Sequence, residues 1–140
     1  MTAIDTNVLI DLEEGTQDVA ERALAAVERA AEYGKVVVCG PVFAELCARA
    51  AGPPAEVLEA LRTGQIAIDA HLSLEVWSAA GTAYGRYARR RRTSGSGVSR
   101  RILADFIIGA HAQTIGTLVT SDVEFFRKAF PDLRVVDVRG

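Results

Sequence analysis

The chain has 140 residues, of which 49% are hydrophobic and 24% charged, and its formal net charge is −2. These values are ordinary for a soluble protein and predict one compact domain over residues 1–140. No apolar run approaches the ~18 residues of a membrane span, and the N-terminus does not resemble a signal peptide, so we expect a cytoplasmic protein without a membrane partner. Cys39 and Cys47 fit neither a disulfide nor a zinc site.

The charge is distributed unevenly along the chain. Residues 1–85 hold 5 Lys and Arg against 13 Asp and Glu, whereas residues 86–140 hold 11 against 5. A segment of sixteen residues contains seven arginines and no acid: Arg86, Arg89, Arg90, Arg91, Arg92, Arg100 and Arg101. Such a segment is either a solvated helix end or a surface that binds a phosphate backbone, and the charge pattern alone does not decide between them.

The hydrophobic pattern of the first half predicts strands that alternate with helices. A short strand at residues 3–4 ends at Asp5 and is followed by a short helix, "NVLIDLEEG". Apolar residues at helical spacing predict a long helix over residues 16–34, with Thr16 as its N-cap. "KVVVCG" is a strand that leads into the helix "PVFAELCARAAG", and a further short helix, "PPAEVLEALRTG", precedes the strand "QIAIDA".

The second half continues the alternation. Ser73 opens a long helix that runs into the arginines and carries apolar residues on one side: Val76, Trp77, Ala80, Ala83, Tyr84 and Tyr87. "TSGSGVS" is a flexible loop, and "RRILADFIIGAHAQTIG" is the next helix. The strand "TLVT", the short helix "VEFFRKAF" and the strand "LRVVDV" complete the chain. Alternating strands and helices predict an α/β fold with a mainly parallel sheet.

Four carboxylates stand where a parallel α/β fold places its ligand site, beyond the carboxyl ends of the strands. They are Asp5, Glu45, Asp105 and Asp122. Each has a structural alternative: Asp5 and Asp122 could cap the helices that follow them, and Glu45 could face solvent. A purely structural role is hardest to assign to Asp105, because the helix around it is apolar on nearly every side and is expected to be buried.

Four carboxylates in one cleft repel each other at neutral pH unless a divalent cation lies among them. Oxygen ligands favour Mg²⁺ or Mn²⁺, and the lack of a cluster of cysteines and histidines argues against zinc. Because Mg²⁺ is usually shared with phosphate, the pattern suggests phosphoryl-transfer or phosphodiester chemistry, with the arginine segment holding the polyanion.

Four stretches in order, "AIDTNVLID", "PVFAELCA", "LADFIIGAHA" and "TLVTSDVEFF", resemble the PIN-domain ribonucleases that form the toxin half of VapBC-type toxin–antitoxin pairs. The resemblance implies a three-layer α/β/α fold around a parallel sheet of about five strands. It also implies that Asp5 and Asp105 bind the metal directly, whereas Glu45 and Asp122 bind it through water or complete the shell of a second metal ion. Four further residues would orient these carboxylates: Thr6, Asn7, Thr120 and Ser121.

The activity implied is cleavage of single-stranded RNA by metal-activated water, which leaves 5′-phosphate and 3′-hydroxyl ends. The residues expected to bind the RNA are Arg89, Arg90, Arg91, Arg92, Arg100 and Arg101. A cognate VapB-type antitoxin is the expected protein partner, in a homodimer or a toxin–antitoxin hetero-oligomer. Many members of the family carry another acid two residues after the Asp122 position; here it is Glu124, whose role the resemblance leaves open.

Two other functions are compatible with parts of the pattern. A receiver-like signalling domain is also a small α/β domain with an aspartate at a strand end, but receivers carry an acidic pair after the first strand, where this chain has Asp5-Thr6-Asn7. A non-catalytic PIN-like RNA-binding protein is the second alternative, although all four acids are present. Of the two histidines, His111 is expected to be structural, and His71 lies in a predicted loop.

Overall fold

The computed structural model describes residues 1–94 and 101–140. Residues 95–99 of the predicted loop, and Arg100 with them, lie outside this description. In the described part of the chain, five strands form one sheet in the order β3-β2-β1-β4-β5, and every neighbouring pair is parallel. The strands are β1 (Thr2–Ile4), β2 (Val36–Cys39), β3 (Ile66–Asp69), β4 (Thr117–Thr120) and β5 (Arg134–Asp137).

The shortest strand is the central one. β1 pairs with β2 and β4 at once, with Ala3 opposite both Val37 and Leu118, and all three of its residues are buried. Burial on both faces requires apolar side chains in consecutive positions, which explains why "TAI" and "VVVC" show no polar alternation.

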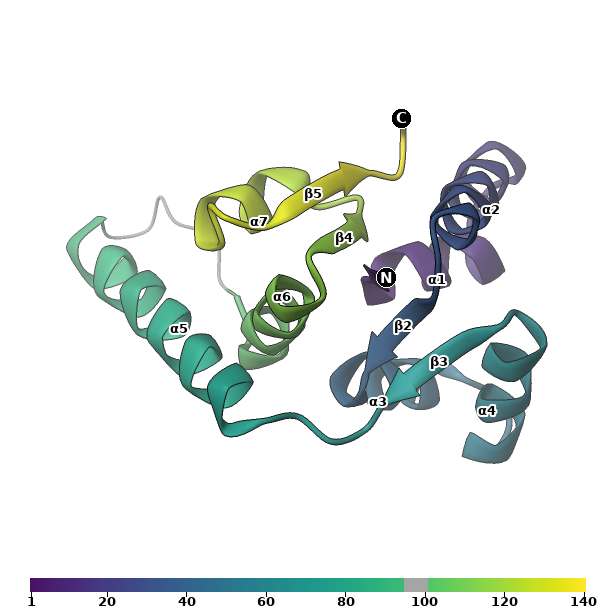
Figure 1. Cartoon of the computed structure of the whole chain (residues 1–140), viewed down its shortest axis with the longest axis horizontal. Helices are drawn as coiled ribbons and strands as arrows, with labels where there is room; N and C mark the ends of the chain where they lie inside the picture. Colours follow the sequence, from purple (N-terminus) through teal and green to yellow (C-terminus); the bar gives the residue numbers. More distant parts are fainter. Residues whose placement is uncertain (95–100) are drawn as a thin grey trace.

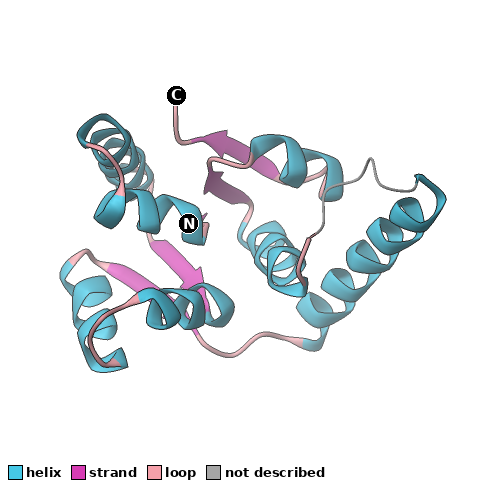
Figure 2. Cartoon of the chain, turned by 180° about the vertical axis from the view of Figure 1, so that it is seen from behind, coloured by secondary structure: helices cyan, strands magenta, loops and turns pink. Residues whose placement is uncertain are grey.

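Helices cover both faces of the sheet (Figures 1 and 2). The helices are α1 (Thr6–Glu14), α2 (Gln17–Glu32), α3 (Gly40–Arg49), α4 (Pro54–Thr63), α5 (Leu74–Ser94), α6 (Leu103–Ile115) and α7 (Val123–Ala129). The chain steps outward from β1 to β3 and then returns to β4 and β5. Because parallel crossovers are right-handed, this reversal puts α1 to α4 on one face and α5 to α7 on the other. The predicted three-layer α/β/α architecture is confirmed.

The strand order also bears on the receiver alternative. Receiver domains have the order 2-1-3-4-5, whereas the order here is 3-2-1-4-5. The observed sheet therefore does not fit a receiver-like domain. The strand order reverses between β1 and β4, so a ligand site is expected at the carboxyl ends of these two strands.

The buried face of α5 contains only some of the apolar residues that the sequence pattern predicted for it. Ser73 does begin this helix, since its Oγ accepts a hydrogen bond from the Val76 amide at 3.3 Å. Four of the predicted apolar residues are buried, namely Val76, Ala80, Ala83 and Tyr87, whereas Trp77 and Tyr84 are 48% and 37% exposed. The buried four follow each other at helical spacing, and the two exposed aromatics lie on the flank of that stripe.

Both cysteines are free; Cys39 is buried in the core, whereas Cys47 is only partly buried. No helix in the described residues combines the length and the apolar character that crossing a membrane requires.

Candidate active site

All four predicted acids line one cleft of about 460 Å³. Asp5 directly follows β1, Asp122 lies two residues after β4, and Glu45 and Asp105 project from α3 and α6. The sheet thus brings together side chains that are up to 117 residues apart in the sequence, at the edge where the strand order reverses.

Asp5 is the most buried of the four acids, with 6% of its surface exposed. Its Oδ1 accepts a hydrogen bond from the Thr6 amide at 2.7 Å, which caps α1. Its Oδ2 accepts hydrogen bonds from Thr120 Oγ1 at 2.7 Å and from Asn7 Nδ2 at 2.9 Å. The capping alternative therefore holds for Asp5 Oδ1, whereas Oδ2 is bonded to residues of the cleft and of the end of β4.

The environment of Asp5 favours its protonated form. Burial is the main cause, and together with the nearby charges of Asp105 and Glu45 it raises the pKa of Asp5 from 3.8 to about 6. The hydrogen bonds from Thr120 and from the Thr6 amide lower this pKa and offset part of the rise. At neutral pH the metal-free fold therefore holds a carboxylate that its surroundings stabilise poorly.

A network of polar groups connects the ends of β1 and β4. Asn7 donates from Nδ2 to Thr120 Oγ1 at 3.3 Å and accepts at Oδ1 from the Ser121 amide at 3.3 Å. Thr120 Oγ1 also accepts a hydrogen bond from the Asp122 amide at 2.9 Å. Ser121 contributes to this network through its backbone amide, whereas Asn7 and Thr120 contribute through their side chains.

Glu45 and Asp105 approach the cleft from opposite faces of the sheet. The hydroxyl of Thr6 donates a hydrogen bond to Glu45 Oε2. Asp105 is the third residue of α6, and its Oδ2 accepts a hydrogen bond from the Ile102 amide at 3.4 Å. Burial raises the pKa of Asp105, although the Ile102 amide and the charge of Arg101 oppose this shift.

The capping alternative is wrong for Asp122. This residue precedes α7, but its side chain accepts no hydrogen bond that would cap the helix. Its carboxylate instead forms an ion pair with Arg101, whose guanidinium lies 4.1 Å from the centre of the Phe125 ring. Glu124, the other acid in this turn, is exposed and is not among the residues that line the cleft.

The donor chemistry of the cleft fits a hard divalent cation, since four carboxylates and no thiol or imidazole line it. Within residues 1–94 and 101–140, however, no three acid, histidine or cysteine side chains are close enough together to hold one ion. All four carboxylates have partners within the fold. Glu45 accepts a hydrogen bond from Thr6, and Asp122 is paired with the charge of Arg101. Asp5 and Asp105 accept the hydrogen bonds described above.

Those predicted RNA-binding arginines that the structure describes fall into two groups. Arg89, Arg90 and Arg92 are exposed and Arg91 is partly exposed in the last turns of α5, and none of them lines the cleft. Arg101 does line it, a position that the sequence pattern could not distinguish from the rest of the arginine segment.

The histidines do not contribute to the cleft. His111 is 2% exposed, and its Nε2 lies 3.0 Å from Asp69 Oδ2, as expected of a structural residue. His71 is exposed between β3 and α5.

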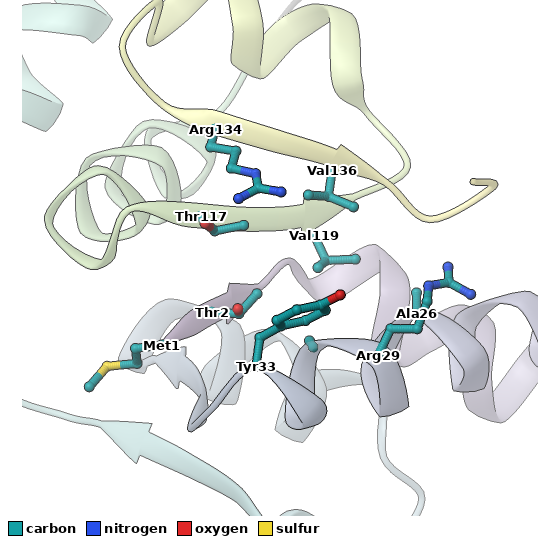
Figure 3. A pocket seen from close by; sticks show the side chains of 10 residues that line it. Met1, Thr2, Ala26, Arg29, Tyr33, Thr117, Val119, Arg134 and Val136 are labelled. Atoms are coloured by element: carbon teal, nitrogen blue, oxygen red, sulfur yellow. The ribbon is translucent and has the colours of Figure 1, made fainter.

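A second cavity, of about 420 Å³, lies between α2 and the strands β4 and β5 (Figure 3). Its walls include the first residues of three strands, Thr2, Thr117 and Arg134, so it opens toward the amino ends of the sheet, opposite the acids. Arg29 of α2 and Tyr33, the residue that follows this helix, line it, and none of the described residues that line it is acidic.

The fold and the cleft together define a parallel α/β protein with an acidic site at its topological switch point. The model of the PIN domain family matches residues 2–131, and the chain belongs to this family. PIN domains are nucleases, and they generally use divalent metal ions. A comparison with curated protein sequences gives no significant match.

Similar solved structures agree with this fold. VapBC-1 from nontypeable Haemophilus influenzae has a TM-score of 0.64 at 21% identity, covering 99% of this chain and 98% of the other. VapBC2 from Rickettsia felis, bound to a DNA fragment from its promoter, has a TM-score of 0.62 at 17% identity, covering 97% of both chains. FitAcB from Neisseria gonorrhoeae has a TM-score of 0.60 at 21% identity, covering 99% and 98%. At these identities the likeness shows the fold.

Proposed function

We propose that the chain is a divalent-metal-dependent endoribonuclease that cleaves single-stranded RNA and acts as the toxin of a VapBC-type pair. The observation that carries this proposal is the buried Asp5 carboxylate, which faces further acids in an open cleft and has a raised pKa. A fold that required only a helix cap at this position would not need Asp105 and Glu45 beside it. Perturbed carboxylates in a cleft are typical of functional sites.

The proposed metal is Mg²⁺ or Mn²⁺, with Asp5 and Asp105 as direct ligands and with Glu45 and Asp122 completing the site. When bound, such an ion lowers the pKa of a water molecule and stabilises the negative charge that develops on the phosphate. The chain itself orients the ligands. Thr120 and the Thr6 amide hold the two oxygens of Asp5, and Asn7 connects this carboxylate to the turn that carries Asp122.

The proposed partner is a VapB-type antitoxin, in a homodimer or a hetero-oligomer in the cytoplasm. The neighbouring structures are complexes named VapBC and FitAcB, which supports a partner of this kind. A groove of about 400 Å³ between α1, α3 and α4 offers an apolar surface for it, lined by Leu9, Leu12, Leu46, Val57 and Leu61 among others.

The proposed activity can be tested with the purified chain and single-stranded RNA. We expect cleavage with Mg²⁺ or Mn²⁺, no cleavage in EDTA, and no cleavage by Asp5→Asn or Asp105→Asn. Asp132→Asn is the matched control, because Asp132 is an exposed aspartate outside the cleft. Cleavage in EDTA, or by both active-site variants, would contradict the metal-nuclease mechanism, and RNA binding without any cleavage would favour the non-catalytic alternative.

A further inference from the structure

Arg101 is the cationic side chain that reaches one of the four acids of the cleft in the described structure. Its guanidinium forms an ion pair with Asp122 Oδ2. The side chains of the pair are 26% and 34% exposed, so the pair is partly shielded from solvent. A second arginine, Arg49, lines the same cleft but pairs with Glu14, which is not one of the four acids that line the cleft.

Three contacts determine where Arg101 lies. Its backbone amide donates a hydrogen bond to the Tyr87 hydroxyl at 2.6 Å, its guanidinium lies over the Phe125 ring, and its Nη1 reaches Asp122. Tyr87 and Phe125 both pack against Phe106, the residue that follows Asp105. Arg101 is therefore anchored to the same aromatic cluster that supports the start of α6, and it does not simply project into solvent.

The position of Arg101 has an electrostatic consequence. Its charge favours the ionised form of Asp105 as well as pairing with Asp122, so it partly compensates the repulsion among the acids. The guanidinium contacts Asp122 through Oδ2, so a divalent ion that takes this oxygen as a ligand has to replace it. The released guanidinium would be close to the acids and free to bind another anion, and its planar set of donors matches a phosphate.

We propose that Arg101 is a built-in counter-cation of the cleft: it neutralises Asp122 in the metal-free protein, is displaced when a divalent ion binds, and then binds a phosphate oxygen of the RNA. This inference rests on the proposed function and adds a competition between two cations for one carboxylate. It separates Arg101 from Arg89–Arg92, which lie outside the cleft.

The competition can be measured without RNA. The full chain, stripped of metal, is titrated with Mn²⁺ in a calorimeter, and the wild type is compared with Arg101→Gln, Arg101→Lys and Arg49→Gln. We expect Arg101→Gln to bind Mn²⁺ about fivefold more tightly, the equivalent of a modest ion pair that no longer has to be broken. Arg101→Lys keeps the competing charge and should stay near the wild type. Arg49→Gln removes an equal charge from the rim and should change the affinity less than twofold.

The second arm measures RNA cleavage at an Mn²⁺ concentration that saturates every variant. We expect Arg101→Gln to lower kcat/KM by about 10- to 100-fold, mainly through KM, because a charge-assisted hydrogen bond to phosphate is removed. Arg101→Lys should recover part of this loss, and Arg49→Gln should stay within about twofold. For Arg101→Gln the expected result is a higher affinity for Mn²⁺ together with a lower kcat/KM for RNA. A variant with a loosened fold would instead show a lower value of both quantities.

The outcomes separate this inference from the proposed function. If the wild type cleaves RNA with Mn²⁺ but Arg101→Gln behaves like Arg49→Gln in both arms, the role of Arg101 is overturned and the nuclease assignment stands. Weaker Mn²⁺ binding by Arg101→Gln would also overturn it. A wild type that neither binds Mn²⁺ nor cleaves RNA would overturn the proposed function and this inference together.

Discussion

The substitution Asp5→Asn should stabilise the metal-free protein at neutral pH while it abolishes the proposed activity. The folded state raises the pKa of Asp5 from 3.8 to about 6, chiefly through burial, so folding carries a cost whenever this carboxylate is ionised. A shift of this size corresponds to about 3 kcal/mol above pH 6. Asparagine avoids that cost, but the NH2 group that replaces Oδ2 cannot accept the hydrogen bonds from Asn7 and Thr120, which removes about 2 kcal/mol in all. The expected net gain is about 1 kcal/mol at pH 7.5.

The pH dependence of this gain identifies its cause. For an acid whose pKa is raised by folding, the destabilisation is complete above the folded pKa and disappears as the pH falls to the unfolded pKa. Between pH 7.5 and pH 5 the advantage of Asp5→Asn should therefore shrink by about 1 kcal/mol. The missing hydrogen bonds do not titrate in this range, so they do not affect the slope.

The assay is urea unfolding of the wild type and the variant in EDTA at several values between pH 5 and pH 8. Asp132→Asn serves as the control, since an exposed loop aspartate should change stability by no more than about 0.5 kcal/mol at any pH. Added Mg²⁺ should stabilise the wild type and not Asp5→Asn. A variant less stable than the wild type at pH 7.5, or a difference that does not change with pH, would refute the reasoning.

Three further predictions concern packing and RNA binding. Gly109→Ala should destabilise the protein by about 1–3 kcal/mol in urea unfolding, because the new methyl group would overlap the Phe130 ring; an unchanged midpoint would show that the ring can move aside. Asp69→Ala should lower the free energy of unfolding by about 1–3 kcal/mol, because it leaves the buried His111 without its partner. Asp69→Asn retains the hydrogen bond and should be less destabilised, and both variants should still cleave RNA. Replacing Arg89–Arg92 by glutamine should weaken RNA binding and lower the salt slope by about 0.7 for each phosphate that is no longer neutralised; an unchanged slope would identify this segment as a solvated helix end.

The elements of the fold were predictable because local sequence encodes them. The apolar runs "VVVC" and "TLVT" predicted β2 and β4, and Ser73 marked the start of α5. The periodicity of α5 was less exact, since it did not separate the buried stripe from the flanking Trp77 and Tyr84. Which flank is covered depends on the neighbouring helix, and a sequence pattern does not specify that neighbour.

The membership of the candidate site was also predictable, but the partners of its members were not. All four acids line the cleft, since residues that follow parallel strands must meet at one edge of the sheet. Asp122 has the sequence context of a helix cap, and nothing near it in the chain indicates that its carboxylate would pair with Arg101, 21 residues away. Likewise, the hydrogen bond from Thr6 to Glu45 joins residues 39 positions apart.

The sequence by itself therefore determined the alternation of strands and helices, the four carboxylates and the family resemblance, because these depend on side-chain periodicity and on motifs within single elements. The tertiary structure decided the strand order, the burial that raises the pKa of Asp5, and which arginine of the described part of the arginine segment enters the cleft. These properties depend on distances between segments that are remote in the chain, and such distances are set only when the sheet and its helices pack together.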